Sequence, residues 1–493
     1  MSNDAHIETE LIAARDDLAT GFDAAPLPPF KPTRRKAPAV VAALLLVIGG
    51  GAFLGLRGDG SQTVRLPVAE ESEADGTEEE LGLTPETTEA AGGIEDSGEA
   101  ASEAVFGRDA ALPAEAGRPD AGLLEWSVDP VYQSQLRQFT SSAGTRFDVV
   151  TSPNRSVENA DGSMVLTYHG TDGYRVSDRL TGEDVGVVNL PFAAHPQWHP
   201  NNRTLLRHLP DPDSDGALWR LLETDVLTGE TEIIADLGGR LRTRTSDDID
   251  WPDATRIHTN EQGAPSTDGS LWAFIVDDAD GQSLGIVTYD LAEQQLIQRA
   301  NLRTDVGAID HIAVSLGGGY VVVTYDDATF VYDRNLENER RLVEGNHPGD
   351  FAFDAQRSET YVVANFADDE DAGWLVAIDL DTLNRTRVFD IFEEGNTSMN
   401  ISGRGFDRPG WAVVSTFDCK AEGAWTCDKV MAVELTTEGR IVNLAHTYNC
   451  GASFWTEPSA VPSHDLQRVY FNSDSGSCGE DGEVFQLRTP RFE

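Results

Sequence analysis

The sequence predicts an all-β chain dominated by a seven-bladed β-propeller, with six or eight blades as the alternatives. From about residue 140 to the C-terminus, a unit of roughly 45–50 residues recurs, which is the length of a four-stranded propeller blade. Each unit has a turn, an apolar strand, an acidic hairpin tip, a second strand ending in Asp, and a polar strand. The apolar runs alternate with period 2, as in Tyr320–Tyr325, which indicates strands rather than helices. A sandwich would not repeat one hairpin signature so regularly.

The last unit lacks a fourth strand, because its strand pattern ends near Arg488. We expect a strand near the start of the region, Arg146–Thr151, to complete that blade and close the ring. Closure removes the exposed edges that make β-sheets prone to aggregation.

The N-terminal part predicts a membrane anchor. Ala37–Leu56 carries no charge and follows the basic residues Lys31, Arg34, Arg35 and Lys36. About 20 apolar residues cross a bilayer core, and the basic side stays in the cytoplasm. A cleaved secretory signal is the alternative, and either one exports the rest of the chain. The predicted segments are a cytosolic tail (1–36), a single-pass transmembrane helix (37–56), a disordered acidic linker (57–122) and the propeller ectodomain (123–493).

Charge narrows the range of partners. The formal net charge is −47 and the isoelectric point is about 4.3. Nucleic acid is excluded as a partner, because phosphate binding needs a basic patch. The linker is rich in Glu and poor in apolar residues, so it cannot form a core and should behave as an extended spacer.

All four cysteines lie in the last part of the chain, at Cys419, Cys427, Cys450 and Cys478. Their spacing fits neither a zinc ribbon nor a CxxC redox motif, and export permits disulfides. Cys419 and Cys427 flank one predicted hairpin tip, while Cys450 and Cys478 lie in two loops that share one face. We therefore predict the pairs Cys419–Cys427 and Cys450–Cys478.

Two turn motifs recur in the units: Ala160-Asp-Gly-Ser163 precedes one predicted strand and Asp225-Val-Leu-Thr-Gly229 follows another. With these motifs the units resemble TolB-type and WD40-like propeller repeats. Segments such as DGSLWAFIVDDADG and SGRGFDRPGWAVVSTF are similar to bacterial exported propellers of unassigned activity, which implies the fold and the compartment. A weaker likeness is to oligogalacturonate lyases, whose propellers bind a divalent metal through histidines. Ser459 stands where such a histidine would be expected, which argues against a metal-dependent lyase.

Polar residues near the starts of the innermost strands form the candidate ligand site. Groups converging from several blades could line a central funnel. The alternative is that they satisfy backbone groups and water in a wet channel. The predicted ligand-binding residues are His195, Glu261, Asp310, His311, His347, Asp350, Arg404 and Glu457.

A second candidate site is an acidic hairpin tip containing Asp211, Asp213 and Asp215, which has the opening of a calcium loop. Leu222 occupies the position of the usual closing Glu, so a hydrated hairpin turn is favoured over a metal site. No cofactor is required, with a divalent cation such as calcium as the alternative.

The sequence favours a binding role over catalysis. It contains no GxSxG, HExxH, CxxC, P-loop or dinucleotide fingerprint in a suitable context, so no catalytic residues are predicted. The preferred function is a membrane-anchored extracytoplasmic propeller that binds or scaffolds an envelope protein or glycan. The alternatives are an exported carbohydrate-active enzyme, lyase-like or hydrolase-like, that uses the funnel, and a purely structural envelope protein.

Overall fold

The structure is a computed structural model that describes residues 107, 122–129, 131–141, 147–170, 172–212, 218–242, 251–260, 262–367, 369–391, 397–419, 424–449, 453–476 and 482–490. The chain divides into two compact units, Met1–Arg65 and Leu66–Glu493, and all described residues belong to the second. The predicted tail, the predicted spanning helix 37–56 and nearly all of the linker lie outside the described residues. Within the described part, no helix is long and apolar enough to cross a bilayer.

Five of the sheets have four antiparallel strands each, arranged in chain order. Their strands are β7 (Gln197–Trp198), β8 (Leu205–His208), β9 (Arg220–Asp225) and β10 (Thr231–Asp236); β11 (Arg256–His258), β12 (Leu271–Asp277), β13 (Ser283–Asp290) and β14 (Gln295–Asn301); β15 (Ile309–Val314), β16 (Tyr320–Tyr325), β17 (Ala328–Asp333) and β18 (Arg340–Glu344); β19 (Gly349–Phe353), β20 (Glu359–Asn365), β21 (Trp374–Asp379) and β22 (Arg385–Asp390); and β23 (Ser398–Ser402), β24 (Trp411–Phe417), β25 (Lys429–Glu434) and β26 (Ile441–His446). The helical elements of the described chain are short, η1 (Phe192–Ala194) and α2 (Gly238–Arg242).

The sixth sheet has nine strands and joins the first and last parts of the described chain. Its path runs β1-β2-β29-β3-β4-β5-β6, with β27 and β28 attached to the other edge of β29. The bounds are β1 (Ser127–Val128), β2 (Gln135–Gln138), β3 (Phe147–Val149), β4 (Met164–His169), β5 (Gly173–Asp178), β6 (Asp184–Val188), β27 (Val461–Pro462), β28 (Arg468–Ser473) and β29 (Gly482–Arg488).

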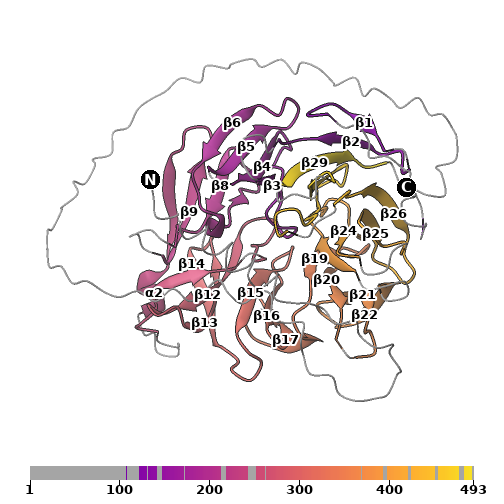
Figure 1. Cartoon of the computed structure of the whole chain (residues 1–493). Coiled ribbons are helices and arrows are strands. Elements are labelled where there is room, and N and C mark those ends of the chain that lie inside the picture. Colours follow the sequence, from indigo (N-terminus) through magenta and orange to yellow (C-terminus); the bar gives the residue numbers. More distant parts are fainter. Residues whose placement is uncertain are drawn as a thin grey trace, which may run out of the picture. The chain divides into compact units, whose positions relative to one another are not determined.

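Neighbouring sheets pack face to face around a common centre. In Figure 1 they follow one another in chain order, and the first strands β15 and β19 lie nearer the centre than β17 and β22. Each successive pair encloses its own apolar cluster; Phe274, for example, packs with Leu221 of the preceding sheet. The series closes on itself, because a further cluster joins Tyr470 of β28 to Val150 and to Val165 of β4.

This packing explains the burial pattern of the strands. All seven residues of β12 are buried, because each inner strand lies between two neighbouring sheets. The outermost strand β10 instead exposes its first three residues. Continuous apolar runs therefore mark inner strands, and mixed sequences mark outer ones.

Aspartates fix the turns between the third and fourth strands. In the Asp225-Val-Leu-Thr-Gly229 turn, Oδ1 of Asp225 accepts hydrogen bonds from the amides of Leu227 and Thr228 at 2.8 and 3.0 Å. Gly229 then adopts a left-handed conformation, with φ of 73°. The same arrangement recurs at Asp178. A side chain that mimics a turn carbonyl is why Asp favours these positions.

The ring closes through β2 rather than through the predicted segment Arg146–Thr151. β2 pairs antiparallel with β29, placing Gln135 opposite Arg488 and Gln138 opposite Phe485. β3, which lies within the predicted segment, takes the other half of the same edge and pairs parallel with Gly482 and Glu483. The prediction missed β2 because its sequence, QLRQ, has one apolar residue and no strand-like alternation.

A buried polar network ties the two chain ends together behind this pairing. Both carboxylate oxygens of Glu158 accept hydrogen bonds from Arg468, at 2.7 and 2.9 Å, and Tyr470 donates to Glu158 at 2.7 Å. Gln486 donates to the Tyr470 hydroxyl and accepts from Arg137 of β2 at 2.6 Å. The network therefore runs from Glu158 through β28 and β29 to Arg137 in β2.

We expect Gly229→Ala to lower the free energy of unfolding by about 1–2 kcal/mol, because an L-residue is strained at a left-handed φ. A Cβ at Gly229 would meet no atom within 4 Å, so the cost is purely conformational. Gly239 in α2 has equally open space and no positive φ. Gly239→Ala is therefore the matched control, and urea denaturation should find it neutral or slightly stabilising. Equal destabilisation by both would contradict this account.

Glu158→Ala should destabilise the fold by about 3 kcal/mol, because it leaves the Arg468 guanidinium and the Tyr470 hydroxyl without their buried acceptor. The exposed turn residue Glu230 provides the control, and Glu230→Ala should stay within about 0.5 kcal/mol of the wild type. Chemical denaturation of both variants checks the difference. A loss below about 1 kcal/mol at Glu158 would mean that the network adds little to closure.

Candidate functional site

The predicted ligand-binding residues lie at the ends of first strands in several sheets. His195 precedes β7, Asp310 and His311 lie in β15, His347 and Asp350 lie at the start of β19, Arg404 follows β23 and Glu457 precedes β27. Glu261 lies outside the described residues. The structure groups some of these side chains into pairs that bond to one another.

Asp350 and Arg404 form a buried ion pair. Nη2 of Arg404 lies 3.0 Å from Oδ1 of Asp350, and the side chains are 5% and 1% exposed. The amide of Gly403 donates to the second carboxylate oxygen at 2.9 Å. Arg404 follows the end of β23 rather than its start, so its guanidinium braces the neighbouring sheet instead of facing solvent.

Asp310 and His311 form a second pair beside it. Nδ1 of His311 lies 3.0 Å from Oδ2 of Asp310, and its Nε2 lies 3.3 Å from the Thr324 hydroxyl. Burial alone would raise the pKa of Asp310, but the hydrogen bonds of His311 and Asn346 and the charge of His311 together outweigh it and lower that pKa. The Asp310 carboxylate is about one-third exposed, so it is the more accessible member of the pair.

His195 is held by an arginine from a distant part of the chain. Nη2 of Arg155 donates to Nδ1 of His195 at 2.8 Å. Burial and the Arg155 charge hold the pKa of His195 well below its usual range, so its ring is neutral. His195 itself has a left-handed backbone conformation, with φ of 48°.

Arg155 belongs to a central segment, residues 150–157, that links the inner ends of three sheets. Asn154 donates to the Gly349 carbonyl at 3.1 Å, at the start of β19. Ser156 lies 3.1 Å from Nε2 of His464, and the Trp198 indole donates to the Val157 carbonyl at 3.0 Å. Sequence reasoning missed this segment because its polar sequence, with Pro153, reads as an ordinary connecting loop.

His347 is a predicted site residue whose ring has a nitrogen left without a hydrogen bond among the described residues. Its Nε2 is buried and forms no hydrogen bond within the described part of the chain. Burial lowers the pKa of His347, although a hydrogen bond with the backbone of Glu344 acts the other way. Its ring makes an edge contact with Phe366 at 5.9 Å between centroids.

The candidate metal sites gain no support. Among the described residues, no group of three or more His, Cys, Asp or Glu is placed to hold a metal ion. Asp211 is described and half-buried, while Asp213 and Asp215 lie outside the described residues. The backbone carbonyl of Glu457 accepts hydrogen bonds from Ser459 and Asn472, and its amide donates to the Ser453 carbonyl.

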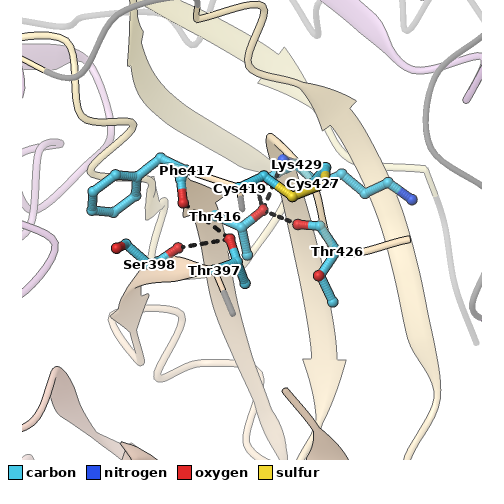
Figure 2. Close-up of a disulfide and its surroundings, with 8 residues drawn as sticks. All are labelled: Thr397, Ser398, Thr416, Phe417, Cys419, Thr426, Cys427 and Lys429. Atoms are coloured by element: carbon cyan, nitrogen blue, oxygen red, sulfur yellow. Dashed lines mark hydrogen bonds between the residues drawn. A yellow bond between two sulfur atoms is a disulfide. The ribbon is translucent and has the colours of Figure 1, made fainter. Parts of the chain in front are cut away.

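The disulfide predicted between Cys419 and Cys427 is confirmed (Figure 2). It bridges the hairpin between β24 and β25, with Cα atoms 5.3 Å apart. Next to it, the Thr416 hydroxyl accepts from the Lys429 amide at 2.9 Å, which holds the base of the hairpin. Cys450 and Cys478 lie outside the described residues, so their pairing stays a prediction.

The Lys429 side chain extends away from the disulfide (Figure 2) and is fully buried. Its ammonium lies 5.5 Å from the centroid of Tyr132 and 6.0 Å from that of Trp425. Burial and the Lys429 charge lower the pKa of nearby His446 to about 3, so this imidazole is neutral. Aromatic faces stabilise a desolvated cation at such distances.

An aromatic cluster that the sequence reasoning missed lies where β3, the tip of β4, η1 and the connection before β27 meet. Trp455 stacks on Phe147 with centroids 3.9 Å apart, and Phe192 and Phe454 contact Trp455 edge-on at 5.6 and 4.9 Å. Tyr168, Phe192, Phe454 and Trp455 are each half-buried. Phe192 and Phe454 each stand three residues before a predicted site residue, and this recurrence was the available signal.

Comparison with known proteins identifies the architecture. No protein-family model and no curated protein sequence matches the chain. Among solved structures, an oligogalacturonate lyase in complex with manganese is 13% identical and covers 74% of this chain and 96% of its own, with a TM-score of 0.51. The oligogalacturonate lyase from Vibrio parahaemolyticus gives the same identity and coverage with a TM-score of 0.50. TolB from Acinetobacter baumannii is 16% identical over 60% of this chain and 62% of its own, with a TM-score of 0.31. The likeness to the lyases shows the fold, and the predicted β-propeller architecture is confirmed.

Arg404→Ala should lower the free energy of unfolding by about 3–5 kcal/mol, because it leaves the buried Asp350 carboxylate without its cation. The double variant Arg404→Ala/Asp350→Ala should lose less than the sum of the two single variants, since the partners then disappear together. Urea denaturation of the four proteins measures the coupling. Additive losses would show that the two groups do not stabilise one another.

Proposed function

We propose that this chain is a membrane-anchored, extracytoplasmic, seven-bladed β-propeller that binds or scaffolds an envelope protein or glycan. The blade count rests on treating the nine-stranded sheet as two adjacent blades. β2 and β27–β29 form one blade, and β4–β6 with the inner segment at Glu158 form the other. Together with the five four-stranded sheets they give seven blades.

The binding role is supported mainly by the contacts of the central segment, residues 150–157. It lies among the inner strand ends and bonds to polar groups there, including His195 and the Gly349 carbonyl. Asp350 and Arg404 are likewise satisfied by one another. A catalytic site needs reactive groups that are oriented towards a substrate and accessible to it. Most of the predicted funnel groups instead hold the fold together, which favours recognition by an outer surface.

That surface is the face that carries the hairpin tips between second and third strands. The aromatic cluster lies there, because the tip of β4 and the connections into β7 and β27 share this end of the sheets. Half-buried Trp and Tyr side chains supply large apolar contact area and dominate many binding surfaces. Asp172 is largely exposed and lies 3.3 Å from Nδ1 of His169, the residue after Tyr168, and it could accept hydrogen bonds from a glycan or a peptide.

Membrane attachment is the second part of the proposal, and it rests on the uncharged run Ala37–Leu56 behind its basic residues. In this arrangement the N-terminus is cytoplasmic, and the acidic linker holds the propeller away from the bilayer. The chain should stay with membranes after washing in high salt. Release by salt alone would show that Ala37–Leu56 does not anchor the chain in the membrane.

An exported carbohydrate-active enzyme is the second candidate. It is favoured by His347, whose buried Nε2 forms no hydrogen bond within the described residues, and by the fold shared with oligogalacturonate lyases. A neutral imidazole nitrogen of this kind could bind a divalent cation. Elemental analysis of the purified chain, followed by a test for polysaccharide cleavage, separates the two candidates. Bound metal together with turnover of a polysaccharide would replace the binding proposal.

We expect the purified chain to capture a specific protein or glycan from the envelope of its own cell, and Trp455→Ala to weaken this capture at least about tenfold, as loss of a central aromatic contact does elsewhere. Trp374, half-buried in the sheet β19–β22, provides the matched control, and Trp374→Ala should leave capture unchanged. Thermal melts of both variants separate lost binding from lost folding. Equal losses in both variants, with intact folds, would move the site away from the aromatic cluster.

A further inference from the structure

β26 is the outermost strand of its sheet, yet all six of its residues are buried. The outermost strand β10 exposes four of its six residues. An outer strand leaves one row of backbone groups unpaired, which invites pairing with another strand. Burial of β26 therefore means that something covers its free edge.

The covering groups come from the chain that precedes β2. The Gly107 amide donates to the Ile441 carbonyl at 2.9 Å, and the Asn443 side-chain amide donates to the Gly107 carbonyl at 3.0 Å. Gly107 thus bonds through both its amide and its carbonyl to β26, and its two partners, Ile441 and Asn443, are two positions apart in that strand. This is the spacing of a parallel ladder, with the Asn443 side chain in place of a backbone donor.

Contacts continue along the same strand towards its C-terminal end. The Ser134 hydroxyl donates to the Leu444 carbonyl. Tyr132 stacks on His446 with ring centroids 4.8 Å apart, and its hydroxyl lies 3.2 Å from Nε2 of His446. Two chain positions 25 or more residues apart in sequence, Gly107 and Tyr132–Ser134, therefore cover one strand.

We propose that the outer edge of β26 is a docking edge for an extended peptide, and that the chain's own segment at Gly107 occupies it. The mode is strand addition, in which main-chain hydrogen bonds give affinity and neighbouring side chains give specificity. The two hydrogen bonds of Gly107 with Ile441 and Asn443 are the main-chain part of this mode. This inference is independent of the ligand proposed for the tip face.

Limited trypsin digestion of the full chain tests the docking. Arg57, Arg65 and Arg108 are the sites available within the linker, since Pro119 follows Arg118. A docked segment must open before a protease can cut it. The Arg108 bond should therefore be cleaved at least about tenfold more slowly than the Arg65 bond, when each rate is divided by that of a synthetic peptide with the same local sequence.

Gly107→Pro removes the donated N–H and cannot adopt the φ of 89° found at Gly107, so it should raise cleavage at Arg108 to the rate at Arg65. Asn443→Ala should do the same in part, through loss of one hydrogen bond. The control Gly98→Pro makes the same substitution elsewhere in the linker and should leave the Arg108 rate unchanged. Cleavage of the wild type at Arg108 as fast as at Arg65, or protection that survives Gly107→Pro, would overturn the proposal.

Discussion

The fold depends on joining β2 to β29, two strands that are far apart in the sequence, and on keeping them paired. The pairing of β2 with β29 joins residues more than 340 positions apart, and closing a loop of that length costs about 6 kcal/mol of chain entropy. Four ladder pairs alone would offset little of this. The Phe139 amide adds a hydrogen bond to the Val484 carbonyl, and apolar burial around Tyr470 and Val150 adds more. Glu158 completes the closure by accepting hydrogen bonds from Arg468 and Tyr470.

Closure in turn determines what every other strand must look like. Because each sheet packs between two neighbours, inner strands such as β12 are buried on both faces. A charged side chain on an inner strand is therefore paired, as Asp350 of β19 is with Arg404. β26 departs from the pattern because the chain before β2 covers its edge.

The sequence predicted those features that are encoded locally. Apolar runs, Asp-based turns and the short spacing between Cys419 and Cys427 each depend on a few adjacent residues, and they indicated the strands, the hairpins and the disulfide. β2 escaped prediction because its strand character comes from the free edge of β29 rather than from its own sequence. Arg404 is a similar case. Its partner Asp350 lies one sheet away, and no spacing in the sequence shows that its guanidinium turns inwards.

The role of the central segment also depends on partners that are far apart in the sequence. Of these features, it matters most for function. Inner strand ends converge with their backbone groups and polar side chains, and such groups must be paired or hydrated when they are buried. Here one short polar stretch supplies several partners at once: Asn154 for the Gly349 carbonyl, Arg155 for His195 and Ser156 for His464. A polar ligand entering the same space would have to replace these intramolecular bonds and would gain little net free energy. Recognition is therefore better served by the half-buried aromatic groups on the tip face. Stacking on Phe147 holds Tyr168 and Trp455 in place, and a ligand that stacks on these rings displaces only water from apolar surface.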